Sequence, residues 1–420
     1  MRVAEFARAG IKQVLNRVPL VVGLNRAAKA RQTAGQYKAS EAHYARRPLS
    51  KDHEQLMGEK LAGHRPAALC MPRVFFIGTD EQQDKSGLLQ ALCKVAQTRW
   101  FVKPDGVYGH NDGRSMHLRR RANAELLWSQ LTVLSSQQWV PDIVLAQTWG
   151  SLIDPVVFSR IRAQWGCMVI NMSMDDRHQY WGGRVGAPGF GTHTLIPHID
   201  LALTAAPECV AWYEKENCPA LYFPEASDPE IFRPMPDLPK IHDVSFVGAR
   251  YGIRERLVTA LRKAGVTVSA YGTGWEAGRL DNDAVPRLFA QSKILLGVGT
   301  IGYCSDFYAL KLRDFDGPMS GSFYLTHANP DLDSLFQVGR EIMTYNDQNS
   351  CVAQVVHFLA HKGEREAIAR AGRSRALLEH TWEQRFRGLF LALGFGDEGL
   401  DVSGMRQPAA QNVENMGAKK

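Results

Sequence analysis

The chain has 420 residues, of which 45% are hydrophobic and 22% are charged, and its formal net charge is +7. This length exceeds what one hydrophobic core usually supports, and the average composition excludes both wholesale disorder and an integral membrane protein. The seven cysteines are scattered and never spaced as C-x-x-C, which argues against a disulfide framework or a zinc site. We therefore expect a globular protein of two domains in a reducing compartment.

The amino-terminal end is strongly basic, because residues 1–31 carry seven Lys or Arg and one acid, Glu5. Apolar residues share one face of a helical wheel and Arg8 and Lys12 lie opposite, until Pro19 ends the pattern. A basic amphipathic helix of this kind predicts contact with an anionic membrane surface. The alternatives are a helix packed on the body or a mobile basic arm. Nucleic acid is not expected as a partner, because no recognised motif or stacking aromatic accompanies the charges.

Residues 33–66 are polar and predict a linker or a solvated helix. Beyond them, short apolar runs alternate with helical stretches, which predicts parallel strands covered on both faces by helices. The expected strands are 74–78, 142–147, 167–173, 201–206 and 221–226 in a first set, and 244–249, 266–272, 294–300, 322–327 and 341–346 in a second. The fold class is therefore α/β, with two Rossmann-like halves.

Local signals define the end of the chain and the domain ranges. Pro330 and Gly339 bracket a short helix between the last two strands. Thr381 and Gln384 predict a capping box that opens a final helix. The predicted ranges are 1–66 for the basic helix and linker, 67–235 for an amino-terminal domain, 236–395 for a carboxyl-terminal domain and 396–420 for a disordered tail.

Several residue patterns follow one another in a fixed order between Lys311 and Leu389. The residues concerned are Arg313, Phe315, Asp316 and Gly321 before a buried strand, then Gly339 and Glu341 at the next strand, then His380 and Trp382 at a helix. This order resembles the group 1 glycosyl transferases of the CgeB-like type, over roughly residues 70–393. The resemblance implies the GT-B architecture, in which two Rossmann-like domains face a central cleft and the last helix returns to the first domain.

Loops at the carboxyl ends of parallel strands are where ligands of such sheets bind. Arg250 and Arg254 follow a strand of the second set, and two guanidinium groups at a helix start suit a diphosphate. The alternative is two surface arginines. Gly272, Gly274 and Trp275 follow the next strand, where glycines would let the backbone approach a ligand or would form a tight turn with a packed tryptophan.

The resemblance gives a role to a second loop of that domain. Asp316 stands where the family has a Glu that accepts hydrogen bonds from the donor ribose, and it is shorter by one methylene. Eight residues earlier, where typical members carry another Glu, this chain has Tyr308, so the contact to the sugar is unassigned. Lys311 and Arg313 flank the loop and are expected to add phosphate contacts or to be solvated helix charges.

Candidates for a base lie in the first predicted domain. Asp175 and Asp176 follow the strand 167–173, where a carboxylate could orient or deprotonate an acceptor hydroxyl, or simply form a turn. His193, in a glycine-rich loop, is the alternative base, because imidazole titrates near neutral pH.

The residues and the resemblance together predict a metal-independent glycosyltransferase. It would move a hexosyl group from a nucleoside diphosphate sugar to a hydroxyl of a glycan, lipid-linked or protein acceptor, with no cofactor besides this co-substrate. Arg250 and the loop dipoles would stabilise the departing diphosphate, and the resemblance implies retention at the anomeric carbon. The expected location is the cytoplasm, peripheral to the inner membrane face through residues 1–31. Two alternatives stay open: a nucleotide-sugar epimerase, and a non-catalytic sugar-nucleotide or glycan-binding protein.

Overall fold

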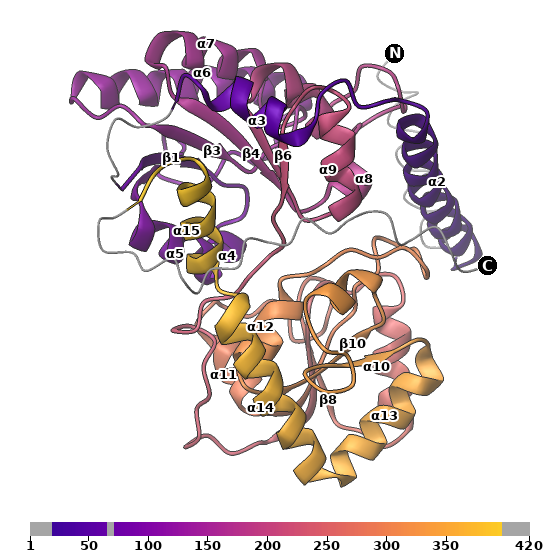
Figure 1. Ribbon diagram of the computed structural model, residues 1–420. Helices are drawn as coiled ribbons and strands as arrows, with labels where there is room; N and C mark the ends of the chain where they lie inside the picture. Colours follow the sequence, from indigo (N-terminus) through magenta and orange to yellow (C-terminus); the bar gives the residue numbers. More distant parts are fainter. Residues whose placement is uncertain (1–18, 65–70, 397–420) are drawn as a thin grey trace. The chain divides into compact units, whose positions relative to one another are not determined.

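The computed structural model describes residues 19–64 and 71–396 (Figure 1). The chain divides into two compact units, and each unit takes several segments of the sequence. The first unit consists of the described part of Met1–Pro48 with Arg177–Pro188 and Phe232–Arg375. The second consists of the described parts of Leu49–Asp176, Gly189–Ile231 and Ala376–Lys420. The expected basic helix before Pro19 and most of the expected tail lie outside the described residues.

The second unit is built on a six-stranded parallel sheet in the order β2-β1-β3-β4-β5-β6. The strands are β1 (Arg73–Ile77), β2 (Gln97–Trp100), β3 (Ile143–Ala146), β4 (Met168–Ser173), β5 (Leu201–Thr204) and β6 (Ala220–Tyr222). All residues of β3, β4 and β5 are buried, as expected for strands covered on both faces. The predicted strands of the first set are confirmed. The edge strand β2 was missed, because it is mostly exposed and has no apolar run.

Helices and short turns connect these strands. They are α3 (His53–Leu61), α4 (Glu81–Gln83), a π-helical turn at Asp84–Leu88, α5 (Leu89–Val95), α6 (Met116–Ser136), α7 (Val156–Trp165), α8 (Asp176–Gln179), a 3₁₀ turn at Thr192–His198, α9 (Pro207–Glu214) and α15 (Trp382–Ala392). The capping box of Thr381 and Gln384 is confirmed at the start of α15. This last helix packs on α5, so it does return to the unit that contains the first sheet.

The first unit is built on a five-stranded parallel sheet in the order β11-β10-β9-β7-β8. The strands are β7 (His242–Val247), β8 (Val268–Tyr271), β9 (Ser292–Leu296), β10 (Phe323–His327) and β11 (Met343–Tyr345). They match the predicted second set. The helices are α2 (Pro19–Ala45), α10 (Arg254–Lys263), α11 (Ala284–Ala290), α12 (Arg313–Met319), α13 (Gln348–Ala360) and α14 (Lys362–Glu379). The short helix predicted between the last two strands is a 3₁₀ turn, Pro330–Ser334.

The prediction of a linker or a solvated helix over residues 33–66 needs correction. Most of this stretch is helical, in α2 and in α3, whose start is capped by Asp52. One side of α2 is buried, with Tyr44 and Ser40 almost inaccessible, so the helix is not simply solvated. Pro19 begins this helix, since proline is compatible with a first helical turn. Among the described residues, no helix is long and apolar enough to cross a membrane.

Candidate nucleotide-sugar site

The loops that follow β7 and β8 are bound tightly to each other. The backbone N–H of Arg250 donates to the carbonyl of Thr273 at 2.9 Å, and the indole N–H of Trp275 donates to the carbonyl of Gly248 at 2.8 Å. A Cβ on Gly272, whose φ is +133°, would lie 2.3 Å from the Gly248 carbonyl oxygen. Packing between the two loops therefore requires glycine at 272 and accounts for the buried Trp275. A ligand contact of Gly272, Gly274 or Trp275 stays a prediction.

Arg254, the first residue of α10, is a buried cation. Its side chain is about 8% exposed, and its guanidinium lies over the ring of Tyr251, 4.0 Å from the centroid. It donates to the carbonyl of Ala249 at 3.0 Å, but it has no ion pair among the described residues, and its buried Nε has no hydrogen-bond partner. Burial lowers the pKa of Arg254. A buried charge without a counter-ion is costly, so this position suits an anionic ligand.

Arg250 has different surroundings from Arg254. Its guanidinium is about one-third exposed and pairs with Glu255 at 2.7 Å and with Glu276 at 2.9 Å. It also lies over the ring of Trp275, 5.3 Å from the centroid. The pair with Glu255 raises the pKa of Arg250. Arg250 would therefore have to exchange carboxylate partners to bind a phosphate, whereas Arg254 has none to exchange.

The start of α12 brings further charges to this edge of the sheet. Asp316 is fully buried, and its Oδ2 lies 3.4 Å from a guanidinium nitrogen of Arg313. The charge of Arg313 adds to the lowering of the pKa of Arg254, so the two guanidinium groups lie within electrostatic reach. Lys311 is half-buried and forms no ion pair within the described part of the chain. The ribose contact of Asp316 stays a prediction, which requires its carboxylate to become accessible.

Asp314 is a buried carboxylate that the sequence analysis did not single out. It accepts hydrogen bonds from the backbone N–H of Lys311 at 2.7 Å and from the hydroxyl of Tyr324 at 2.7 Å. Burial raises its pKa. These bonds tie the first turn of α12 to β10, so Asp314 holds the position of Lys311.

Tyr308, in the loop between β9 and α12, stacks on His327, with 5.0 Å between the ring centroids. The loop is held there by Arg177, which donates to the backbone carbonyl of Tyr308 at 3.0 Å. Arg177 also forms two bonds with Asp331, of 2.5 and 2.9 Å, and both side chains are nearly buried. Tyr308 therefore places an aromatic side chain at this point of the loop, and its contacts fix the orientation of the ring.

The base candidates of the second unit have different surroundings. Asp176 is buried, and its Oδ1 accepts from the hydroxyls of Thr192 at 2.7 Å and of Tyr213 at 3.1 Å. Burial raises its pKa to about 6. His193 instead lies near Glu216, at 3.6 Å, and Asp175 is half-buried beside β4. A catalytic role for Asp175, Asp176 or His193 stays a prediction.

A polar network at the carboxyl ends of β1 and β3 was missed. Asp84 accepts from the Tyr108 hydroxyl at 2.9 Å, its Oδ1 has no hydrogen-bond partner, and burial raises its pKa to about 7. His110 lies 2.6 Å from both the Gly78 carbonyl oxygen and the Thr148 hydroxyl, and burial lowers its pKa to about 4. These are single residues far apart in the sequence, so no motif or spacing pointed to them.

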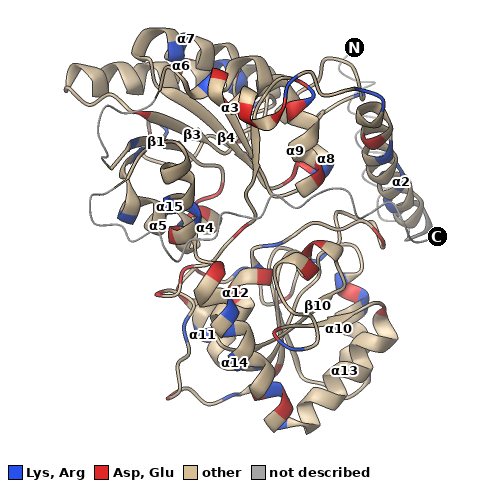
Figure 2. Cartoon of the chain, viewed as in Figure 1, with Lys and Arg blue, Asp and Glu red and all other residues tan. Residues whose placement is uncertain are grey.

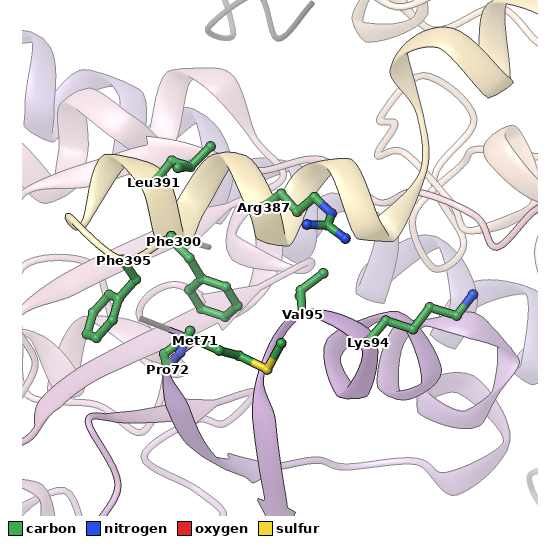
Figure 3. A pocket seen from close by; sticks show the side chains of 9 residues that line it. Met71, Pro72, Lys94, Val95, Arg387, Phe390, Leu391 and Phe395 are labelled. Carbon is green, nitrogen blue, oxygen red and sulfur yellow. The ribbon is translucent and has the colours of Figure 1, made fainter. Parts of the chain in front are cut away.

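A separate hollow lies beside the amino-terminal start of β1 in the second unit (Figure 3). Its apolar lining includes Met71, Val95, Phe390 and Phe395, and Lys94 and Arg387 add basic groups. Both cations are paired with carboxylates, Lys94 with Glu230 and Arg387 with Glu383. We therefore place the candidate site at the carboxyl edge of the first unit's sheet. In residues 19–64 and 71–396, no group of three or more His, Cys, Asp or Glu is placed to hold a metal ion.

Comparison with known proteins agrees with this geometry. Residues 253–390, which include α10 and α12, match the model of a family described as glycosyl transferase-like. No curated protein sequence matches the chain. The resemblance to group 1 glycosyl transferases is confirmed.

Solved structures show the same fold at low sequence identity. A sucrose-phosphate synthase from Thermosynechococcus elongatus is 11% identical, with a TM-score of 0.52 over 79% of this chain and 98% of that one. HepE from Anabaena, solved with UDP and glucose, is 10% identical, with a TM-score of 0.55 over 77% and 99%. A glycosyltransferase from Rickettsia africae is 10% identical, with a TM-score of 0.52 over 77% and 97%. The two parallel sheets form a GT-B fold, and residues 253–390 are similar to a family of glycosyl transferase-like proteins.

Proposed function

We propose that the chain transfers a sugar from a nucleoside diphosphate sugar to an acceptor hydroxyl. The observation that carries this proposal is Arg254, a buried guanidinium without a carboxylate partner at the carboxyl end of β7. The first turn of a helix also presents free N–H groups and the positive end of the helix dipole to an anion. A diphosphate bound there would give Arg254 the counter-ion that the described part of the protein does not supply.

The same groups would assist the chemical step. Negative charge develops on the diphosphate as the bond to the sugar breaks, and fixed positive groups stabilise it most when they need no rearrangement. Arg254 is held by its bond to the Ala249 carbonyl and by the Tyr251 ring, and Arg313 lies beside Asp316. Arg250 could join them if it leaves Glu255 and Glu276. This electrostatic arrangement is how the chain would activate the leaving group, and metal independence is part of the proposal.

The fold neighbours support the choice of donor. HepE was solved with UDP and glucose, so a protein of this architecture accommodates a nucleotide and a sugar. We extend this to the present chain by proposing a nucleotide-sugar donor and a glycan, lipid-linked or protein acceptor. Retention at the anomeric carbon and a location at the cytoplasmic face of a membrane are further parts of the proposal, supported by the family resemblance and the basic amino-terminal sequence.

The test is a panel of nucleotide sugars assayed for thermal stabilisation and, with candidate acceptors, for release of nucleoside diphosphate. Ligand binding raises the melting temperature by mass action. A glycosyltransferase releases nucleotide and extends the acceptor, whereas an epimerase would alter the sugar without an acceptor and a binding protein would be stabilised without turnover. The variant to compare with the wild type is Arg254→Gln, whose melting temperature should no longer rise when a nucleotide sugar is added. A panel that neither stabilises the protein nor yields nucleotide would overturn the proposal.

A further inference from the structure

The helix α2 lies outside residues 253–390 in sequence but packs within the first unit. Its inner side covers the loop between β9 and α12, which we call the β9–α12 loop (residues 297–312). Ala30 and Tyr37 pack on a small apolar cluster of that loop, and the rings of Tyr37 and Phe307 are 4.8 Å apart. The thiol of Cys304 lies 3.5 Å from the carbonyl oxygen of Ala30. The loop is therefore partly buried by the amino-terminal helix.

A second set of contacts fixes the carboxyl-terminal half of α2. The amide of Gln36 donates to the carbonyl of Gly183 at 3.1 Å, and the hydroxyls of Tyr44 and Tyr180 are 3.3 Å apart. The ring of Tyr44 also stacks on Trp181. These contacts hold the helix to the segment Arg177–Pro188, whose Arg177 bonds the same β9–α12 loop. The helix is thus anchored along its length and cannot rotate freely about its axis.

At its amino-terminal end, α2 brings a cation to the corner where Arg254 lies. The Arg26 guanidinium lies over the ring of Tyr303, 5.4 Å from the centroid, and Tyr303 meets Tyr251 edge-on at 6.3 Å. The guanidinium of Arg254 in turn lies over the Tyr251 ring, 4.0 Å from its centroid. The charge of Arg26 also contributes to lowering the pKa of Glu255, which is a partner of Arg250. A continuous series of contacts therefore leads from the helix to the buried arginine, with a cation at each end and two aromatic rings between them.

Close packing makes this arrangement rigid where the loops meet. A Cβ on Gly252, whose φ is +63°, would lie 2.7 Å from the carbonyl oxygen of Gly302. The backbone segments that carry Tyr251 and Tyr303 are therefore in direct contact. A shift of the β9–α12 loop would push Tyr303 against Tyr251. Because the Tyr251 ring packs on Arg254, the shift would also disturb Arg254.

We propose that α2 is part of the donor site, as a positioning element for the β9–α12 loop and as the source of a further cation, Arg26, near the diphosphate. This inference rests on the proposed function, because it specifies which parts of the chain recognise the nucleoside diphosphate. Basic residues are spread along α2 (Figure 2), and among its described side chains Arg26 is the cation that contacts an aromatic residue of the β9–α12 loop. Arg31 and Lys38 are exposed on the same helix, and neither contacts the β9–α12 loop among the described residues, which makes Arg31 a matched control.

The experiment measures the affinity of UDP by titration calorimetry for the full chain and single variants. Arg26→Ala should raise the dissociation constant about threefold, as expected for an exposed charge, and Arg26→Lys should restore most of the affinity. The deficit should shrink at high salt, because salt screens an exposed charge. Arg31→Ala should bind UDP as the wild type does. Tyr303→Leu should weaken binding, whereas Tyr303→Phe should not, because only the ring is needed.

The outcomes separate this inference from the proposed function. If the wild type binds neither UDP nor other nucleoside diphosphates, the proposed function fails. If the wild type binds and Arg26→Ala and Tyr303→Leu bind equally well, only the role of α2 fails. A deficit of Arg26→Ala that does not change with salt, or that Arg31→Ala shares, would also overturn the role of Arg26 as a local cation. Melting temperatures equal to that of the wild type show that the Arg26 variants are folded.

Discussion

The guanidinium of Arg254 lies over the ring of Tyr251, 4.0 Å from the centroid, and has no carboxylate partner in the part of the chain that the structure describes. Removing such a charge removes a desolvation cost along with one hydrogen bond, so Arg254→Met should leave the melting temperature of the ligand-free protein unchanged or raise it. The same variant should lose roughly 2 kcal/mol or more of nucleoside diphosphate affinity. Calorimetric titration and thermal unfolding measure the two effects. A variant that is less stable but binds equally well would show that Arg254 is structural.

Arg250→Ala should weaken binding of the whole donor and of free nucleoside diphosphate alike, by at least about tenfold. The physical reason is the loss of a charge-assisted contact at the β7 loop. Glu276→Gln is the control, because it frees Arg250 from one of its carboxylates and should not weaken binding. Unchanged nucleotide affinity of Arg250→Ala in the same titration would remove Arg250 from the site.

Asp316→Asn keeps the shape of the side chain but replaces one acceptor oxygen with a donor. If the carboxylate holds the ribose hydroxyls, the preference for ribose over deoxyribose donors should shrink, as measured by the ratio of kcat/KM for the two donors. The partly exposed neighbour Arg313 loses its charged partner in this variant, so the melting temperature is measured alongside. Wild-type preference together with a wild-type rate would assign Asp316 a structural role only.

Burial raises the pKa of Asp84 from its ordinary 3.8 to about 7, and this shift predicts a pH dependence of stability. Between these values the folded protein binds a proton that the unfolded chain has released, so the free energy of unfolding falls as pH rises and levels off above about 7. Asp84→Asn removes this effect and can still accept from Thr79 and Tyr108. The variant should therefore gain stability relative to the wild type between pH 5 and pH 8, by at most about 4 kcal/mol. If the difference in melting temperature between Asp84→Asn and the wild type does not change between pH 5 and pH 8, the prediction is wrong.

The basic amino-terminal sequence predicts binding to vesicles that contain anionic lipid at low salt, with weaker retention on neutral vesicles. Because α2 begins at Pro19 and its later residues pack on the first unit, the variant to compare lacks residues 1–18 only. It should lose the difference between the two kinds of vesicle and keep its affinity for the donor. Sedimentation measures the first and calorimetry the second. Equal sedimentation of the shortened chain would show that these residues are not the anchor.

The strands could be predicted from the sequence because a buried parallel strand is a short continuous apolar run. The exception is β2, an edge strand whose side chains are mostly exposed, so solvent contact removed the signal. The extent of α2 was also missed. Its stability comes from a few aromatic contacts such as Tyr44 with Trp181, which lie far apart in the sequence and leave no periodic apolar stripe.

The candidate site could be predicted in part, for a related reason. Arg250 and Arg254 stand a turn apart after a strand, so their place at one loop is a local property of the sequence. That one of them is buried without an ion pair and the other is paired twice depends on packing, which the sequence does not display. Arg177 and Asp331, 154 residues apart, form a nearly buried ion pair for which no motif exists.

The packing of α15 on α5 sets an order of events during synthesis. Chains leave the ribosome from the amino terminus at about 5–20 residues per second, and early domains commonly fold before later ones appear. In this protein the first sheet is made early, but the surface of α5 that α15 covers stays open until the segment beyond residue 376 emerges. The first unit, which ends at Arg375, is by then entirely synthesised. We therefore expect the nascent chain to complete the first unit before the second, and to need protection of the exposed face of α5 in the meantime.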